Sequence, residues 1–112
     1  MKYAIPVSGG VLAAHFGHCE QFALIDVDEK NKKILRTEMA PAPPHQPGLL
    51  PEWLSRQDVK VVIAGGMGAR AQDLFNQNGI NVLIGAPSEK PEKIILDYLN
   101  GKLVTGDNVC DH

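Results

Sequence analysis

Apolar residues in the first forty positions are grouped into segments of strand length. Three strand-length segments, 2–8 (KYAIPVS), 21–28 (QFALIDVD) and 32–39 (KKILRTEM), are separated by glycine-containing or polar stretches. In the second segment, alternate residues from Phe22 are expected to face one side of a sheet, and alternate residues from Ala23 the other. The short polar turn between the last two segments predicts an antiparallel hairpin.

The second half of the chain alternates helical patterns with short apolar runs. The runs 59–66 (VKVVIAGG) and 80–84 (INVLI) are almost continuously apolar, which is typical of strands buried on both faces. Helices are predicted over residues 51–57 and 69–78, and a third helix is predicted after a Ser88 cap.

Proline is concentrated between these halves. Residues 40–51 (APAPPHQPGLLP) hold five of the eight prolines and predict a semi-extended loop, of a length that is often functional or mobile in a compact domain. Pro6, inside the first predicted strand, cannot donate a hydrogen bond to a neighbouring strand. We therefore expect it at an edge position, at a bulge or at the end of the strand.

The predicted order of elements is β-β-β-α-β-α-β-α. Strands that alternate with helices in the second half imply parallel pairing through right-handed crossovers, whereas the first half is antiparallel. We therefore predict an α/β fold with a mixed, five-stranded, ribonuclease-H-like sheet and helices on its faces. Residues 1–112 are expected to form one domain, with 40–51 as a proline-rich loop and 105–112 as an irregular tail.

Composition narrows the class of protein. The chain has 112 residues, of which 44% are hydrophobic. This is enough for a hydrophobic core that needs no disulfide or structural metal to fold. Its 11 Lys and Arg and 13 Asp and Glu give a net charge of -2. Proteins that bind nucleic acid or membrane surfaces usually carry a basic excess, so neither partner is expected, and any anion must be bound by a local site.

Two cysteines are too few for a disulfide scaffold. The N-terminal residues lack the apolar core of a signal peptide, and no apolar run reaches the roughly 18 residues of a membrane span. A cytoplasmic protein with reduced thiols is the expectation.

The stretch HFGHCEQF, at 15–22, is the first candidate site. His15, His18 and Cys19 carry imidazole and thiol groups, which suit zinc, copper and iron–sulfur centres. A closed zinc site needs four ligands, and the backbone would be strained if the adjacent His18 and Cys19 both bound the same ion. The alternative is a loop in which Cys19 is a small core residue.

The stretch AGGMGARAQDL, at 64–74, is the second candidate site. Three glycines follow a buried strand and precede a helix, so main-chain N–H groups and the helix N-terminus could converge on an anion, with Arg70 nearby. The pattern lacks a dinucleotide or Walker signature, so it specifies no nucleotide. A purely structural turn is the alternative, but the carboxyl end of a parallel strand favours an anion site.

The C-terminal stretch NVCDH is a third candidate, because Cys110 and His112 are again soft ligands. Such a tail could fold over a site or have no role. His45, in the proline-rich segment, is a weaker candidate.

Catalysis has little support. The first predicted strand carries no carboxylate for the two-metal chemistry of a ribonuclease-H nuclease, and Ser8 lacks a G-x-S-x-G context. A Cys19 nucleophile paired with His15 or His18 stays open.

The Ser-Gly-Gly after the first strand, HFGHCEQFALIDVD, the stretch from LLPEW to LIGA, and YLNGKL together resemble the dinitrogenase iron-molybdenum cofactor biosynthesis family. The resemblance runs from residue 2 to about residue 104. Its most specific parts are His-Phe-Gly at 15–17, with Phe22 downstream, and Ala-Gly-Gly-Met-Gly at 64–68. The family includes cofactor carriers of nitrogenase assembly and the orange protein of sulfate reducers.

The resemblance implies a non-enzymatic carrier for an anionic metal–sulfur cluster, such as a molybdenum–copper sulfide or an iron-molybdenum cofactor-like cluster, with cofactor-assembly proteins as possible partners. The expected cluster-binding residues are Ser8, His15, His18, Gly65, Gly66, Met67, Gly68 and Arg70. Cys19, Cys110 and His112 are the candidates for direct metal ligation.

Two other functions stay open at this point. The first is a simple transition-metal binding or sensing module that uses cysteine and histidine directly, and the second is an interaction domain without metal.

Overall fold

The structure is a computed structural model that describes residues 1–14, 16, 19–43 and 49–106. The strands are β1 (Lys2–Ser8), β2 (Val11–Leu12), β3 (Gln21–Asp28), β4 (Lys33–Pro41), β5 (Val59–Ile63) and β6 (Asn81–Leu83). The helices are α1 (Leu49–Arg56), α2 (Ala69–Gln77) and α3 (Pro91–Leu99).

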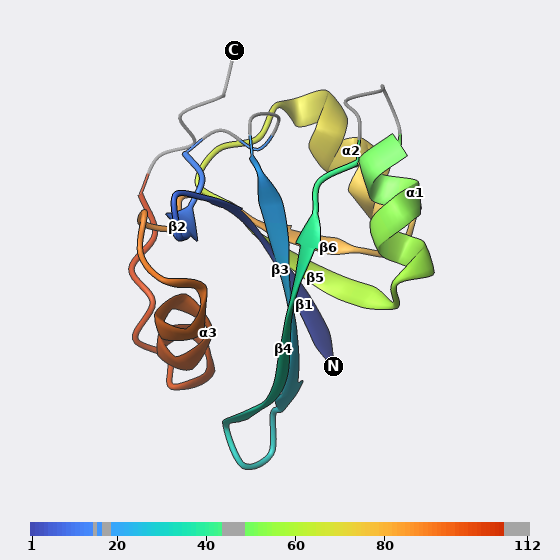
Figure 1. Cartoon of the computed structure of the whole chain (residues 1–112). Helices are drawn as coiled ribbons and strands as arrows, with labels where there is room; N and C mark the ends of the chain where they lie inside the picture. Colours follow the sequence, from blue (N-terminus) through green and yellow to red (C-terminus); the bar gives the residue numbers. More distant parts are fainter. Residues whose placement is uncertain (15, 17–18, 44–48, 107–112) are drawn as a thin grey trace.

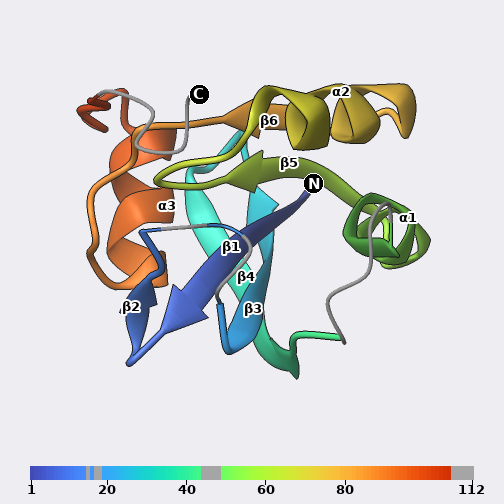
Figure 2. The same ribbon diagram turned by 90° about the horizontal axis from the view of Figure 1, so that it is seen from above.

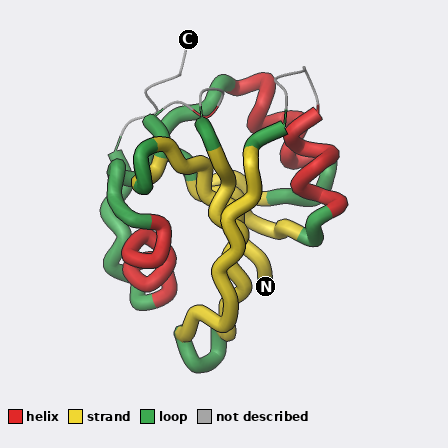
Figure 3. The backbone as a smooth tube through the Cα atoms, in the orientation of Figure 1, coloured by secondary structure: helices red, strands yellow, loops and turns green. Residues whose placement is uncertain are grey.

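One mixed sheet forms the centre of the molecule, as predicted (Figure 1). Its strand order is β4-β3-β1-β5-β6, and the two-residue β2 pairs with the end of β1. β3 pairs antiparallel with both β1 and β4, whereas β5 pairs in parallel with both β1 and β6. β4 therefore runs in the same direction as β1 and is a terminal strand of the sheet. Figure 3 shows the strands at the centre of the molecule, with helices on both sides.

Helices cover both faces of the sheet (Figure 2). α1 and α2 lie on one face, where Leu54 and Phe75 join the buried cluster that contains Phe22 and Leu24. α3 lies on the other face, where its buried isoleucines contact the cluster that contains Ala23. The alternation predicted for β3 is therefore confirmed, and it divides the core into two apolar layers.

Some predicted boundaries were wrong. β4 continues to Pro41 and α1 starts at Leu49, so regular structure occupies both ends of the segment predicted as a 40–51 loop. α3 starts at Pro91 with Lys90 as its N-cap, and not after Ser88. The sheet also gains β2, which has only two residues and is too short to produce a periodic pattern.

Pro6 lies in a central strand, two residues before its end at Ser8, so of the three expected positions only the edge strand is excluded. Its carbonyl oxygen accepts a hydrogen bond of 2.8 Å from the N–H of Ala13, on the side away from β3. The nitrogen of a strand residue points to the same side as its carbonyl, so the missing N–H does not face β3. The registered pairing with β5 stops at Ala4, two residues earlier. Pro6 is tolerated because its strand has no β5 partner at this position.

None of the helices in the described ranges is long and apolar enough to span a membrane.

Candidate functional site

The two main candidate segments leave the sheet at the same end. β1 and β5 are parallel neighbours, so the loop after Ser8 and the turn after Ile63 emerge side by side (Figure 1). The N–H of Phe16 donates a hydrogen bond of 3.1 Å to the carbonyl oxygen of Gly66. The loop that was singled out for its histidines is therefore in direct contact with the glycine turn.

Gly65 is buried where the loop crosses this turn. A Cβ atom on Gly65 would lie 3.2 Å from the carbonyl oxygen of Ala14 and 3.1 Å from a methyl group of Leu12. The carbonyl oxygen of Gly65 accepts a hydrogen bond of 2.9 Å from the N–H of Gly85. Close packing of three backbone segments accounts for glycine at this position.

Helix α2 begins at this edge with open main-chain donors. Gly68 is the N-cap in an extended conformation, and no described side chain caps the helix. The first helical hydrogen bond runs from the N–H of Gln72 to the carbonyl oxygen of Gly68, at 3.1 Å. The N–H groups of residues 69–71 therefore have no acceptor within the helix, and they carry the positive end of its dipole.

Arg70 adds a full positive charge to this helix end. Its side chain is exposed in the first turn of α2. None of the ion pairs formed between described residues involves Arg70. A guanidinium in this position can form charge-assisted hydrogen bonds to an anion that lies against the helix N-terminus.

Met67 was expected among the cluster-binding residues, but its side chain does not reach the surface. Its side chain is 1% exposed and belongs to the buried cluster beneath α2. Its carbonyl oxygen accepts a hydrogen bond of 2.9 Å from the side-chain amide of Gln72. Met67 therefore packs in the core beneath α2, where its thioether fills space as methionine commonly does.

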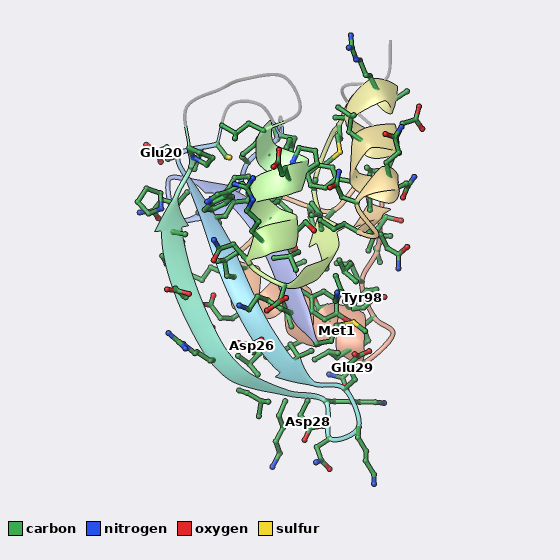
Figure 4. The ribbon with its side chains drawn as sticks, turned by 90° about the vertical axis from the view of Figure 1, so that its right-hand side faces the viewer. Met1, Glu20, Asp26, Asp28, Glu29 and Tyr98 are labelled. Carbon is green, nitrogen blue, oxygen red and sulfur yellow. The ribbon has the colours of Figure 1, made fainter. Side chains whose placement is uncertain are left out.

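Glu20, which the sequence analysis did not single out, closes the base of the loop (Figure 4). Its carboxylate accepts a hydrogen bond of 2.9 Å from the N–H of Gly9, and its own N–H lies 2.9 Å from the carbonyl oxygen of Val7 and 3.2 Å from the hydroxyl of Ser8. Ser8 thus helps to hold the loop closed. The sequence feature that could have indicated Glu20 is an acidic residue immediately before a strand that follows a glycine turn.

An aromatic cluster attaches the loop to the helices. The ring of Phe16 packs against Phe22, at a centroid distance of 5.6 Å, and edge-on against Phe75 in α2, at 5.4 Å. Phe22 also packs against Trp53 in α1, at 5.8 Å. The position of Phe16 is therefore fixed by the same core that supports α2.

Cys19 is half-buried, and burial raises the pKa of its thiol to about 11. A metal ion bound by Cys19 would have to displace a proton that is held more tightly than in an exposed cysteine. Among the described residues, no three His, Cys, Asp or Glu side chains are grouped as a metal site would require. His15, His18, His45, Cys110 and His112 lie outside the described residues.

The raised pKa of Cys19 predicts slow alkylation. In a Cys110→Ser variant at pH 8, iodoacetamide is expected to react roughly ten- to a hundredfold more slowly with Cys19 than with an ordinary thiol, because little thiolate forms. The rate should rise with pH until the thiol ionises near its pKa of about 11. The same variant in urea is the control, because unfolding should restore the ordinary rate. Equal rates in the two states would contradict the burial of this thiol.

These features define a small α/β domain with a mixed sheet, and its glycine turn and open helix end are suited to binding an anion. Residues 1–101 match the model of the family described as dinitrogenase iron-molybdenum cofactor, and the chain belongs to this family. Membership confirms the resemblance and associates the chain with a metal–sulfur cofactor.

Three similar proteins each cover more than nine-tenths of the chain. Uncharacterized protein MJ0580 of Methanocaldococcus jannaschii is 29% identical over 106 residues, which cover 92% of this chain and 89% of the relative. The crystal structure of PH0822 has a TM-score of 0.85 and 28% identity, over 94% of both chains. The apo form of the orange protein from Desulfovibrio gigas has a TM-score of 0.75 over 96% of this chain and 93% of that protein. Its identity is 17%, so it shows a shared fold alone.

Proposed function

We propose that this protein is a non-enzymatic carrier of an anionic metal–sulfur cluster. The cluster would be held between the loop after β1 and the turn before α2. The observation that carries the proposal is the hydrogen bond between Phe16 and Gly66, which holds the loop against the turn that leads into α2. No side chain in the described part of the chain caps the N-terminus of this helix.

The charge at this edge suits an anionic cargo. Open N–H groups at the start of α2 and the guanidinium of Arg70 supply positive potential without a basic excess over the whole chain. Gly68 is partly exposed at the same helix end and leaves room for a ligand, because nothing lies within 4 Å of where its Cβ would be. Glu20 adds a negative charge at the base of the loop, and its carboxylate accepts a hydrogen bond from the N–H of Gly9.

The cargo that we propose is a molybdenum–copper sulfide cluster or an iron-molybdenum cofactor-like cluster, exchanged with cofactor-assembly proteins. Sulfide ligands accept hydrogen bonds from main-chain N–H groups, from Arg70 and from histidine side chains. We propose that His15 and His18 contribute such donors, together with Ser8 and the segment from Gly65 to Gly68. No covalent chemistry by the protein is required.

Anaerobic reconstitution tests the proposal. Tetrathiomolybdate with copper is expected to give a coloured complex that stays with the protein through gel filtration. Arg70→Ala and His15→Ala should each weaken cluster retention by about tenfold, because a hydrogen bond to a charged group contributes roughly 1.5 kcal/mol. Absorbance and metal content per chain measure the retention.

Arg56→Ala is the matched control. Arg56 is an exposed arginine that pairs with Glu52 at the end of α1. It precedes β5, whereas Arg70 follows that strand, so the two lie at opposite ends of β5. Retention should be unchanged in this variant. If Arg70→Ala and His15→Ala also retain the full colour, the proposed placement is wrong.

Direct ligation by cysteine is the competing function, and it makes the opposite prediction. Alkylation of both cysteines in the unfolded chain, followed by refolding, should abolish metal uptake if Cys19 and Cys110 are ligands. Under the carrier proposal, alkylated protein that refolds should still bind the cluster.

A further inference from the structure

The outer edge of β4 is unpaired in the described part of the chain. β4 is the terminal strand of the sheet and has nine residues, whereas β6 at the opposite edge has three. Figure 4 shows β4 as the outermost strand, next to β3. A long strand edge with free N–H and C=O groups is a template for pairing with another strand.

The register of the sheet shows which residues present these groups. The N–H of Ala42 donates to the carbonyl oxygen of Glu20 at 3.1 Å, one step beyond the registered pairs of β3 and β4. In an antiparallel ladder such hydrogen-bonded pairs recur every second residue, so Arg36, Glu38 and Ala40 point their main-chain groups toward β3. Thr37 and Met39 therefore point theirs outward. Pro41, which has no N–H, also falls in the outward set, as expected at an edge.

The side chains of β4 carry two kinds of complementary group. Leu35 is 66% exposed and Met39 is 43% exposed, and both are among the few large apolar side chains at the surface. Arg36 and Glu38 are also exposed. Arg36 and Glu38 lie opposite Asp26 and Leu24 of β3, whereas Met39 lies opposite Ala23. Arg36 and Glu38 therefore lie on one face of the strand, and Met39 lies on the other.

We propose that β4 pairs with β4 of a second copy of this chain, in an antiparallel arrangement with a two-fold axis at Thr37. Each outward-pointing Thr37 would then exchange main-chain hydrogen bonds with its own copy. Arg36 would lie opposite Glu38 of the second copy. This pair occurs twice because of the symmetry.

Charge selects this register over its neighbours. Moving the two-fold axis by one residue would place either Arg36 opposite Arg36 of the second copy or Glu38 opposite Glu38 of the second copy. Like charges directly opposite one another destabilise a strand pair, and opposite charges stabilise it. Because the main-chain groups of Arg36 and Glu38 point inward, these residues would form the non-hydrogen-bonded pairs of the outer ladder, whose side chains approach most closely.

The strand also carries features that limit the strength of pairing. Its register shifts between Asp26 and Val27, which leaves Leu35 as the extra residue of a bulge. Pro41 ends the strand without an outward N–H. The contact is one strand wide and smaller than a standard interface, so the dimer should dissociate in the range of roughly 0.01 to 1 mM.

Sedimentation velocity over that concentration range tests the proposal. The chain is expected to shift from monomer to dimer, and either Arg36→Glu or Glu38→Arg should raise the dissociation constant by about tenfold or more. An equimolar mixture of the two single variants should associate about as strongly as the original chain, because every charge pair across the interface is again opposite. The loss in the single variants is specific to the Thr37 register, because in either neighbouring register each variant keeps one like-charge pair or exchanges it for another.

Lys60→Glu is the control for altered net charge, because Lys60 is exposed on β5, away from the edge of the sheet. It should leave association unchanged. Arg36→Glu places a second acid opposite Asp26 of β3, so chemical denaturation of each variant at low concentration must show that the monomer is folded. A chain that stays monomeric throughout overturns the proposal. Association that the single variants leave unchanged, or that their mixture does not restore, overturns the register.

Discussion

Phe16→Ala is expected to lower the free energy of unfolding by about 3 kcal/mol, because a buried ring is lost and a cavity remains. Phe16 is 6% exposed, and its ring contacts Phe22 and, edge-on, Phe75. The same ring holds the loop after β1 against α2. The hydrogen bond from its N–H to Gly66 should open more often, so the Phe16 amide should exchange faster with deuterium. Urea denaturation and hydrogen exchange measure the two effects.

Phe16→Leu is the matched control. Leucine keeps an apolar group at this position, so the expected loss is below about 1.5 kcal/mol and the amide should stay protected. A loss below about 1 kcal/mol in Phe16→Ala, or exchange equal to that of the original chain, would mean that the aromatic cluster does not anchor the loop.

Gly65→Val is expected to push the loop away from the glycine turn. The Cβ atom alone would lie 3.2 Å from the carbonyl oxygen of Ala14, and valine adds two further methyl groups to this contact. Overpacking of this kind costs about 1–3 kcal/mol. If the cluster is held between loop and turn, its retention should fall by about tenfold or more, because displacing a positioning group weakens every interaction that depends on it. Denaturation and anaerobic reconstitution are the measurements.

Gly68→Ala is the control that distinguishes steric overlap from the mere replacement of a glycine. Nothing lies within 4 Å of a Cβ at Gly68, so this variant should lose less than about 1 kcal/mol and keep its main-chain N–H. Equal destabilisation by Gly65→Val and Gly68→Ala would show that the close approach at Gly65 is unimportant. Normal cluster retention in a folded Gly65→Val variant would contradict the proposed site and leave the fold assignment intact.

Apolar segments of strand length, bounded by glycine-containing or polar turns, made the long strands predictable from the sequence. The predicted ranges of β1 and β3 agree with the structure, because their alternate residues face two different apolar layers. The boundaries around the proline-rich segment were wrong, since Leu49 and Leu50 belong to helix α1 although they precede Pro51. Proline is tolerated in the first turn of a helix, so it did not mark the residue at which this helix starts.

The sequence predicted only those features of the candidate site that follow from main-chain topology. A glycine turn after a parallel strand indicated the edge at which α2 begins, and the contact between Phe16 and Gly66 agrees with it. The burial of Met67 and the loop contacts of Glu20 depend on tertiary packing. Neither has a periodic signal in the sequence. The candidate histidines stay predictions, because His15 and His18 lie outside the described residues.

The direction of β4 has a consequence for how cargo would be shared. β4 is parallel to β1, so its C-terminal end lies at the same end of the sheet as the candidate site. In a two-fold antiparallel pair of β4 strands, the two sites would open in opposite directions. Each copy would then load and release its cluster independently, with a stoichiometry of one cluster per chain and no cluster bridging two chains.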